Sequence, residues 1–291
     1  MNENLFSSLP SNRRVGLIDL VQTPTTEASH AFAGLIRRAA EEEGGRVVLA
    51  NKAVHPMIVP NEQERAIDDA MRLLVVTQYP KRQAAEAAFA KRERWDRENS
   101  QESVQTFAVR PVNRIESLLG RTLPHTLGRL GRQPVPEIKS AESRDALIES
   151  ALVLGEQPDE ARWITLADRA GDRPIWMLNF LEFAKTAVYA EAKEGASPAD
   201  SISGARAYRR YGSGMASSLA AVGGRVGWSG YPIGQLSGPD DGRWHQIAIA
   251  VYPSAAAMMT MLSLPKYKAA HVHRAAALAR TRLLATQPLD G

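Results

Sequence analysis

The chain has 291 residues, 44% hydrophobic and 23% charged, with a net charge of +4, which is typical of a globular protein with one or two cores. It contains no cysteine, which excludes disulfides, thiol catalysis and cysteine-ligated zinc or iron–sulfur centres. Residues 1–14 lack the hydrophobic stretch of a secretory signal and no apolar run reaches bilayer length, so we expect a cytoplasmic protein with no membrane partner.

The first 112 residues predict four strands and two helices. Alternating or continuous apolar runs indicate the strands, and apolar residues at helical spacing indicate the helices. The turn Thr23-Pro24 ends the first strand, and Gly44-Gly45 ends the first helix. In chain order the predicted elements are a strand at 14–22, a helix at 28–43, strands at 46–54 and 71–79, a helix at 83–98 and a strand at 103–112.

A second set of elements in the same order begins at residue 174. Residues 113–168 separate the two sets and predict a linker with helices near 143–154 and 158–168. We then expect a strand at 174–183, a helix at 203–222, strands at 225–233 and 244–252, helices at 255–262 and 265–280, and a strand at 282–287. Gly212-Ser213-Gly214 predicts a break within the first of these helices.

Identities at equivalent points support an internal repeat. Gly44-Gly45-Arg46 corresponds to Gly223-Gly224-Arg225, and Tyr79-Pro80 corresponds to Tyr252-Pro253. The repeated order β-α-β-β-α-β is the ferredoxin-like arrangement. We therefore predict a degenerate first repeat at 1–112, a helical linker at 113–170 and a second repeat at 171–291.

Two such repeats predict an α+β fold in which the sheets cover one another. A four-stranded sheet with helices on one side leaves its other face bare, and a second copy covers it most simply, as an intramolecular, pseudo-dimeric α+β barrel. The protein would then be a monomer with an internal pseudo-dimer, or a homodimer of such chains. Because the two sheets cover each other, we expect no nucleic-acid partner, although the same topology occurs in RNA-recognition domains.

The strand at 244–252 suggests which residues line the barrel interior. We expect Ile247 and Ile249 to pack under the helices, and the alternate residues to face the interior. The small Ala248 and Ala250 would then leave a ligand pocket in the second half, unless tryptophan or methionine side chains fill it. Further interior or nearby substrate-binding candidates are Trp228, Trp244, Gln246, Tyr252, Tyr211 and His271.

The second half resembles domain-of-unknown-function family 1330 of the dimeric α+β barrel superfamily. The resemblance rests on WMLNFLEF (176–183), AYRRYG (207–212), VGGRVGW (222–228), VYPS (251–254) and PKYKAAHVHRAAALARTRLL (265–284). Its relatives include monooxygenases of activated aromatic rings, polyketide cyclases, haem-degrading enzymes and isomerases. The resemblance therefore implies small-molecule chemistry without naming the reaction.

Polar residues in apolar surroundings are the candidates for chemistry. Asn179 interrupts an apolar strand, so it either ties strands together or faces a ligand, and Asp19 occupies the equivalent position in the first half. If both face the interior, they form an amide–carboxylate pair able to orient and deprotonate a substrate. His273 and Arg274 match the family pattern. His273 is then an acid/base candidate or a structural histidine, and Arg274 binds a substrate carboxylate or pairs with an acid.

Cofactors are not required by any pattern in the sequence. His271 and His273 are two residues apart, so on a helix they cannot bind one metal ion together. The resemblance leaves haem as an alternative, because some relatives hold haem iron through a histidine on this helix, where His271 and His273 lie. Otherwise we expect no cofactor and no metal.

The acid-free region 243–288 completes the functional prediction. It contains six Lys or Arg residues and three histidines, which form either a solvated surface or a positive field that favours an anionic small molecule. We therefore expect a cofactor-independent enzyme, such as a cyclase, isomerase or monooxygenase, acting on an anionic or aromatic substrate. The alternative is a non-catalytic ligand-binding or assembly protein with the same barrel.

Overall fold

The fold is described from a computed structural model of the whole chain. The structure describes residues 6, 11–59, 71–99, 104–112, 131–152, 158–190, 202–238 and 242–289. Parts of the predicted linker (113–130 and 153–157) and of the turn before the strand at 244–252 lie outside these residues. The two predicted sets of elements are both present, and each has the order β-α-β-β-α-β when α9 and α10 are counted as one broken helix.

The strands and helices lie close to the predicted ranges. The first half contains β1 (Val15–Val21), α2 (Thr26–Glu42), β2 (Arg46–Ile58), β3 (Leu73–Tyr79), α4 (Arg82–Asn99) and β4 (Val104–Pro111). Two helices follow, α6 (Ala141–Leu152) and α7 (Glu160–Ala170). The second half contains β5 (Ile175–Phe183), α8 (Gly204–Ala221), β6 (Arg225–Ser237), β7 (Gln246–Tyr252), α9 (Ala255–Ser263), α10 (Pro265–Ala277) and β8 (Leu278–Pro288).

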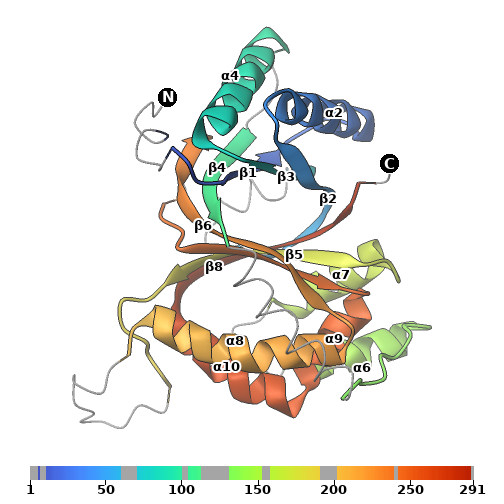
Figure 1. Cartoon of the computed structure of the whole chain (residues 1–291). Helices are drawn as coiled ribbons and strands as arrows, with labels where there is room; N and C mark the ends of the chain where they lie inside the picture. The colour runs from blue at the N-terminus through green and yellow to red at the C-terminus, as the bar shows by residue number, and fades with distance from the viewer. Residues whose placement is uncertain are drawn as a thin grey trace.

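The eight strands close into one barrel in the order β1-β3-β2-β8-β5-β7-β6-β4. The antiparallel ladders β2–β8 and β4–β6 join the halves, so two ferredoxin-like units form a single α+β barrel. Figure 1 shows α2 and α4 on one side of the barrel and α8, α9 and α10 on the opposite side. The predicted fold class is confirmed.

The two halves use the same strand register. Val15 of β1 pairs with Tyr79 of β3, and Ile175 of β5 pairs with Tyr252 of β7. Counting four residues along from each start places Asp19 and Asn179 at equivalent positions. The two residues can therefore be compared directly.

The barrel interior is a packed core, which corrects the predicted orientation of the strand at 244–252. Ile247 and Ile249 lie inside the barrel, and Ala250 and Tyr252 pack with the helices. Every strand contributes to the interior, which buries Ile18, Leu20, Leu49, Leu74, Val76, Phe107, Val109, Leu178, Phe180, Trp228, Ile247, Ile249 and Leu284, together with Met71 and Trp244. The expected ligand pocket in the interior is therefore absent among the described residues, because branched and aromatic side chains fill it.

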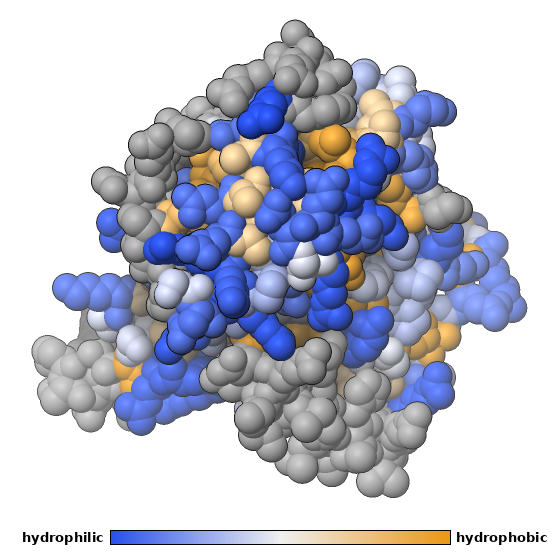
Figure 2. Space-filling model, turned by 45° about the horizontal axis from the view of Figure 1, so that its top comes forward, coloured by the Kyte–Doolittle hydropathy of each residue, from blue (hydrophilic) through white to orange (hydrophobic). Residues whose placement is uncertain are grey.

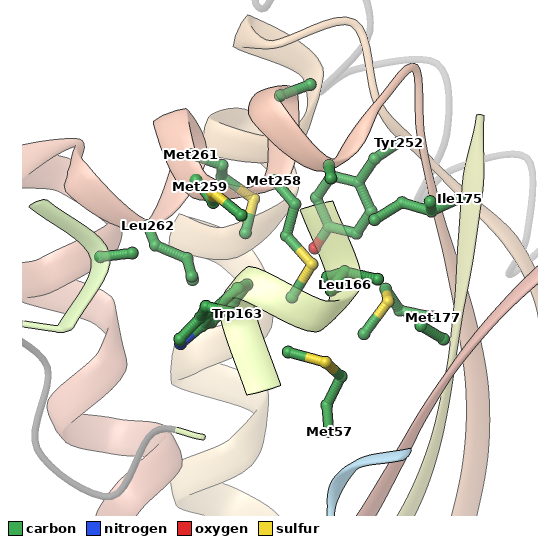
Figure 3. Packing of buried hydrophobic residues seen from close by; sticks show 14 of the residues in the cluster. Met57, Trp163, Leu166, Ile175, Met177, Tyr252, Met258, Met259, Met261 and Leu262 are labelled. Atoms are coloured by element: carbon green, nitrogen blue, oxygen red, sulfur yellow. The ribbon is translucent and has the colours of Figure 1, made fainter. Parts of the chain in front are cut away.

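A second apolar layer lies between the sheet of the second half and its helices. α7 inserts Trp163 and Leu166 into this layer, and both side chains are fully buried. Figure 3 shows the methionines of α9 and Met177 of β5 gathered around these two side chains. The helices of the segment between the two halves thus belong to the core of the second half.

Two helix boundaries differ from the predictions. α8 continues through Gly214 without a break. A Cβ at this position would lie 2.6 Å from Cβ of Ala270, so the glycine lets α8 and α10 pack closely. α10 ends at Ala277, where the sequence predicts helix as far as residue 280. Strand pairing overrides helical propensity here: Leu278 pairs with Phe183, and Arg280 forms an ion pair with Glu182 at 2.9 Å.

One face of the molecule carries mainly polar groups. Figure 2 shows one face as mostly hydrophilic, with hydrophobic side chains in small groups. Within the described part of the chain, no helix combines the length and apolar character needed to span a bilayer.

Candidate functional site

The layer between sheet and helices in the first half holds a closed charged network. Arg92 of α4 forms an ion pair with Asp19 and donates to Oγ1 of Thr106 at 2.6 Å. The Thr106 hydroxyl in turn donates to Asp19 at 2.8 Å. Arg92 and Asp19 are 4% and 1% exposed. The cavity beside them has about 10 Å³ of space, about enough for one water molecule, so this half is filled by its own side chains.

Burial and the ion pair act in opposite directions on Asp19. Burial raises the pKa of its carboxyl, while the charge of Arg92 and the hydrogen bonds from Thr106 and Arg92 lower it. The side chain faces α4 and not the barrel interior, because its neighbours in alternation, Leu17 and Val21, both pack with the helix layer. The predicted pairing of Asp19 with Asn179 across the interior is therefore wrong.

At the position equivalent to Asp19, the second half has the amide of Asn179. Nδ2 of Asn179 donates to the backbone oxygen of Met177 at 2.9 Å and to that of Ala248 at 3.5 Å. Both predicted possibilities remain open for this residue, because the bonds tie it to the sheet while the side chain is only half-buried. No donor to its Oδ1 is found among the described residues, which leaves an acceptor on the helix-facing side of the sheet.

Arg274 of α10 is the counterpart of Arg92 in its half. Each arginine bonds a threonine on the last strand of its half, and Arg274 donates to Oγ1 of Thr281 at 3.4 Å. Within the described parts of the chain, no carboxylate lies within ion-pair distance of Arg274, whereas Arg92 has Asp19. The two halves differ in this way because the carboxylate of Asp19 in β1 is replaced by the amide of Asn179 in β5.

Four tyrosines lie near enough to Arg274 to interact electrostatically with its charge: Tyr208, Tyr211, Tyr252 and Tyr267. Tyr211 and Tyr267 bring their hydroxyl oxygens to 3.4 Å, and the rings of Tyr208 and Tyr211 lie 5.2 Å apart. Burial raises the pKa of all four phenols, to about 12 for Tyr267. These hydroxyls therefore stay protonated at neutral pH and can donate hydrogen bonds.

At equivalent strand positions, the helix-facing side of the sheet is more exposed in the second half than in the first. In the first half the helix-facing residues Val75, Thr77 and Thr106 are fully buried. In the second half the helix-facing residues of β7 and β5, and the side chains above them, are half-buried: Gln246, Ala248, Ala250, Asn179, Tyr208 and Arg274. We call Asn179, Thr281, Arg274 and the four tyrosines the Arg274 cluster.

The two histidines of α10 lie in different surroundings. His271 is 5% exposed and packs against Tyr267, and burial, reinforced by the charge of Arg274, lowers its pKa to about 4. It is therefore neutral at pH 7. Nδ1 of His273 shares a hydrogen bond with the hydroxyl of Tyr189 at 2.8 Å. The prediction of His273 as acid or base stays a prediction.

His271 does not fit a haem group, because its side chain packs against Tyr267 and is almost inaccessible. Nδ1 of His273 is bonded to Tyr189, which leaves Nε2, and haem at this residue stays a prediction. The space under α10 contains the Arg274 cluster. In the described ranges, no group of three or more His, Asp or Glu side chains could hold a metal ion.

The remaining predicted site residues divide between the two layers. Trp228 and Trp244 belong to the barrel interior, where Trp244 packs against Phe180 and carries the guanidinium of Arg280 at 4.1 Å from its ring. Gln246 faces the other way and donates to Oγ of Ser229 at 3.0 Å. Tyr252 and Tyr211 lie in the Arg274 cluster, as does Arg274 itself.

Sequence reasoning missed three members of the cluster. Tyr208 reads equally well as a core residue, and Tyr267 and Thr281 are unremarkable on their own. A signal was present for Tyr267: with His271 and Arg274 it forms an i, i+4, i+7 series, which places all three on one face of α10.

Several solved structures are similar to this chain. No family model matches this chain, and no curated protein matches it. The chain is similar to a protein of unknown function from Rhodopseudomonas palustris, with 33% identity over 46% of this chain and 96% of that chain and a TM-score of 0.41.

Two further solved structures match along nearly the whole chain. A proposed monooxygenase from Lactobacillus acidophilus has 10% identity, covers 96% of this chain and 95% of its own, and gives a TM-score of 0.46. Chlorite dismutase from Candidatus Nitrospira defluvii has 12% identity, covers 99% and 95%, and gives a TM-score of 0.42. The class of protein is an α+β barrel of two ferredoxin-like units, a conclusion that rests on the strand order and registers described above.

Proposed function

We propose that this chain is a small-molecule enzyme of the α+β barrel type, which binds a compact anionic substrate in the Arg274 cluster. The observation that carries the proposal is the difference between the halves. Asp19 neutralises Arg92 in the first half, whereas Asn179 leaves Arg274 without a carboxylate among the described residues. A buried or half-buried charge without an opposite charge nearby is costly, and an anionic ligand would compensate it.

The cluster offers a distinct role to each polar group. Arg274 would hold a carboxylate or enolate oxygen, and Oδ1 of Asn179 would accept a hydrogen bond from a substrate hydroxyl or amide. The tyrosine rings would pack against an aromatic or apolar part of the substrate. Such a mixture of apolar walls and few polar groups is typical of small-molecule sites.

The electrostatics favour reactions in which negative charge develops on the substrate. A guanidinium and protonated phenols are donors that stabilise an enolate or phenolate without themselves losing a proton. This suits an isomerase or cyclase step through an enolate, or a monooxygenase-like reaction on an electron-rich ring. The proposal needs no bound cofactor.

The test begins with binding of benzoate, a small aromatic carboxylate, measured by titration calorimetry at low ionic strength. We expect saturable binding to the wild type and at least tenfold weaker binding to Arg274→Gln. Arg209→Gln, which removes an exposed charge from the same pair of helices, is the matched control and should bind like the wild type. Equal binding by all three proteins, or no saturable binding, would contradict the proposal.

A non-catalytic ligand-binding role is the second candidate. It is favoured by His271, which is nearly inaccessible and therefore supplies no obvious base. The two candidates differ in turnover. An enzyme should consume cyclic or aromatic keto acids in a screen by mass spectrometry, with loss of product in Arg274→Gln, whereas a binding protein should retain its ligand unchanged.

A further inference from the structure

A second amide lies near the Arg274 cluster, on the same face of the sheet as Asn179. Thr281 of β8, which binds Arg274, pairs with Leu181 of β5, and Leu181 pairs with Gln246 of β7. These residues form one row across the sheet, so Thr281 and Gln246 are two strand spacings apart, or about 10 Å. Asn179 precedes Leu181 by two positions in β5 and therefore faces the same side. Both amides thus lie on the side of the sheet that Arg274 faces.

The orientation of each amide is fixed by the groups that it contacts. Nδ2 of Asn179 donates to two backbone oxygens, which can only accept. Nε2 of Gln246 donates to Oγ of Ser229 at 3.0 Å, and this hydroxyl donates its own proton to the backbone oxygen of Ile247 at 3.2 Å. Among the described residues no donor reaches Oδ1 of Asn179 or Oε1 of Gln246, and both side chains are half-buried. Two acceptor oxygens are therefore left for a ligand.

The strand that carries Gln246 differs from its counterpart in the first half. The registers place Ala248 at the position of Val75, and Gln246 at the position of Leu73. Leu73 and Val75 are fully buried, whereas Gln246 and Ala248 are half-buried. An apolar surface that is covered completely in the first half thus corresponds to a partly polar and more exposed surface in the second.

We propose that the Arg274 cluster selects aromatic carboxylates with a hydroxyl group in the para position, and that Gln246 is the residue that determines this selectivity. The inference rests on the proposed function, in which Arg274 holds the carboxylate. The para position is the one farthest from the carboxylate, and Gln246 lies two strands away from the threonine that binds Arg274.

The chemistry of the amide explains why a hydroxyl is selected. Oε1 of Gln246 accepts a hydrogen bond and cannot donate one, so a phenolic hydroxyl satisfies it. A methoxy group has a similar oxygen but no proton, and it would cover the amide oxygen without pairing it. Leaving an acceptor covered and unpaired costs binding free energy, so the two ligands should be distinguished.

The test compares benzoate, 4-hydroxybenzoate and 4-methoxybenzoate by titration calorimetry on the whole chain. At pH 7 all three acids are carboxylates, and the phenol keeps its proton. Gln246→Leu introduces the residue that the first half has at this position and leaves the backbone pairing of β7 unchanged. Gln133→Leu removes an exposed amide from another part of the chain and is the matched control. Thermal unfolding checks that both variants are folded.

We expect the wild type to bind 4-hydroxybenzoate at least fivefold more tightly than benzoate, and 4-methoxybenzoate no more tightly than benzoate. In Gln246→Leu the ratio between 4-hydroxybenzoate and benzoate should fall below twofold, whereas Gln133→Leu should keep the ratio of the wild type. Equal affinities for the hydroxy and methoxy acids, or a ratio that survives Gln246→Leu, would overturn the proposal. If Gln246→Leu does not fold, the three ligands on the wild type still decide.

Benzoate separates this inference from the proposed function. If benzoate binds and is weakened by Arg274→Gln, but the hydroxyl adds no affinity, then the carboxylate site stands and the selectivity does not. If none of the three acids binds to the wild type, both proposals are overturned.

Discussion

Asp19 and Asn179 occupy equivalent positions in β1 and β5, and the first accepts hydrogen bonds where the second donates them. Asp19 receives the guanidinium of Arg92 and the hydroxyl of Thr106. Asn179 gives its amide hydrogens to two backbone oxygens of its own sheet. Asp19 thus neutralises a buried arginine in the first half, whereas Asn179 at the equivalent position leaves Arg274 half-buried without a carboxylate among the described residues.

Removing Asp19 should destabilise the first half strongly. Asp19→Ala leaves the guanidinium of Arg92, which is 4% exposed, without its carboxylate, and we expect a loss of about 3–5 kcal/mol in the free energy of unfolding. Urea denaturation followed by circular dichroism measures the loss. The double variant Asp19→Leu with Arg92→Met should recover at least half of it, because no buried charge remains; no recovery would show that the ion pair is not the cause.

Introducing a carboxylate at the equivalent position of the second half should also be unfavourable. Asn179→Asp cannot donate to the backbone oxygens of Met177 and Ala248, so we expect a loss of about 1–3 kcal/mol. Under the proposed function, the same change should weaken benzoate binding at least tenfold, because the new carboxylate competes for Arg274. Asn179→Ala separates the two effects: it should lose stability yet bind benzoate more tightly than Asn179→Asp does.

Two glycines of α8 provide a matched pair with opposite expected signs. Gly212→Ala adds a methyl group that meets nothing within 4 Å, so it should stabilise the protein by up to about 1 kcal/mol through helix propensity. Gly214→Ala places a methyl group 2.6 Å from Cβ of Ala270 and should destabilise it by about 1–3 kcal/mol. Thermal unfolding of both variants tests this, and stabilisation by Gly214→Ala would mean that α8 and α10 can separate at little cost.

His271 should make stability depend on pH between about 4 and 6.5. Its pKa is lowered from 6.5 to about 4 in the folded protein, so the unfolded chain binds the additional proton in that range. Stability should therefore fall as the pH decreases from 6.5 towards 4, with about 2–3 kcal/mol of the fall due to this residue. Urea denaturation of the wild type and of His271→Gln at pH 7 and 4.5 measures how far the free energy of unfolding falls between the two pH values. An equal fall in both proteins would show that His271 does not titrate in this way.

Most of the architecture could be predicted from the sequence because each half repeats strong local signals. The turn glycines, the Tyr-Pro breaks and the apolar runs place nearly all strands, and the structure confirms the barrel. The orientation of the strands could not be predicted in the same way. Ile247 and Ala248 lie on opposite faces of β7, and both faces are covered, so alternation shows that two faces exist without showing which is interior.

The sequence predicted several residues of the candidate site but not the layer of the fold in which they meet. Asn179, Arg274, Tyr211 and Tyr252 are polar or aromatic residues whose types suit ligand binding, and the structure brings them to one helix–sheet layer. Trp228 and Trp244 have equally suitable side chains but belong to the opposite face. The decisive contact, Arg274 with Thr281, joins a helix to the strand that follows it, and no periodicity encodes such a pairing.

The ladders β2–β8 and β4–β6 join two halves of one chain into a single barrel. In a barrel of two identical subunits, any substitution appears twice, so a residue that seals one layer must seal the other. Here a single substitution can act on one half alone. The first half can keep a buried ion pair between Asp19 and Arg92 that stabilises it. The second half can keep Arg274 half-buried, at a cost in stability. Because both halves belong to one polypeptide, each half can acquire its own substitutions, which two identical subunits cannot do.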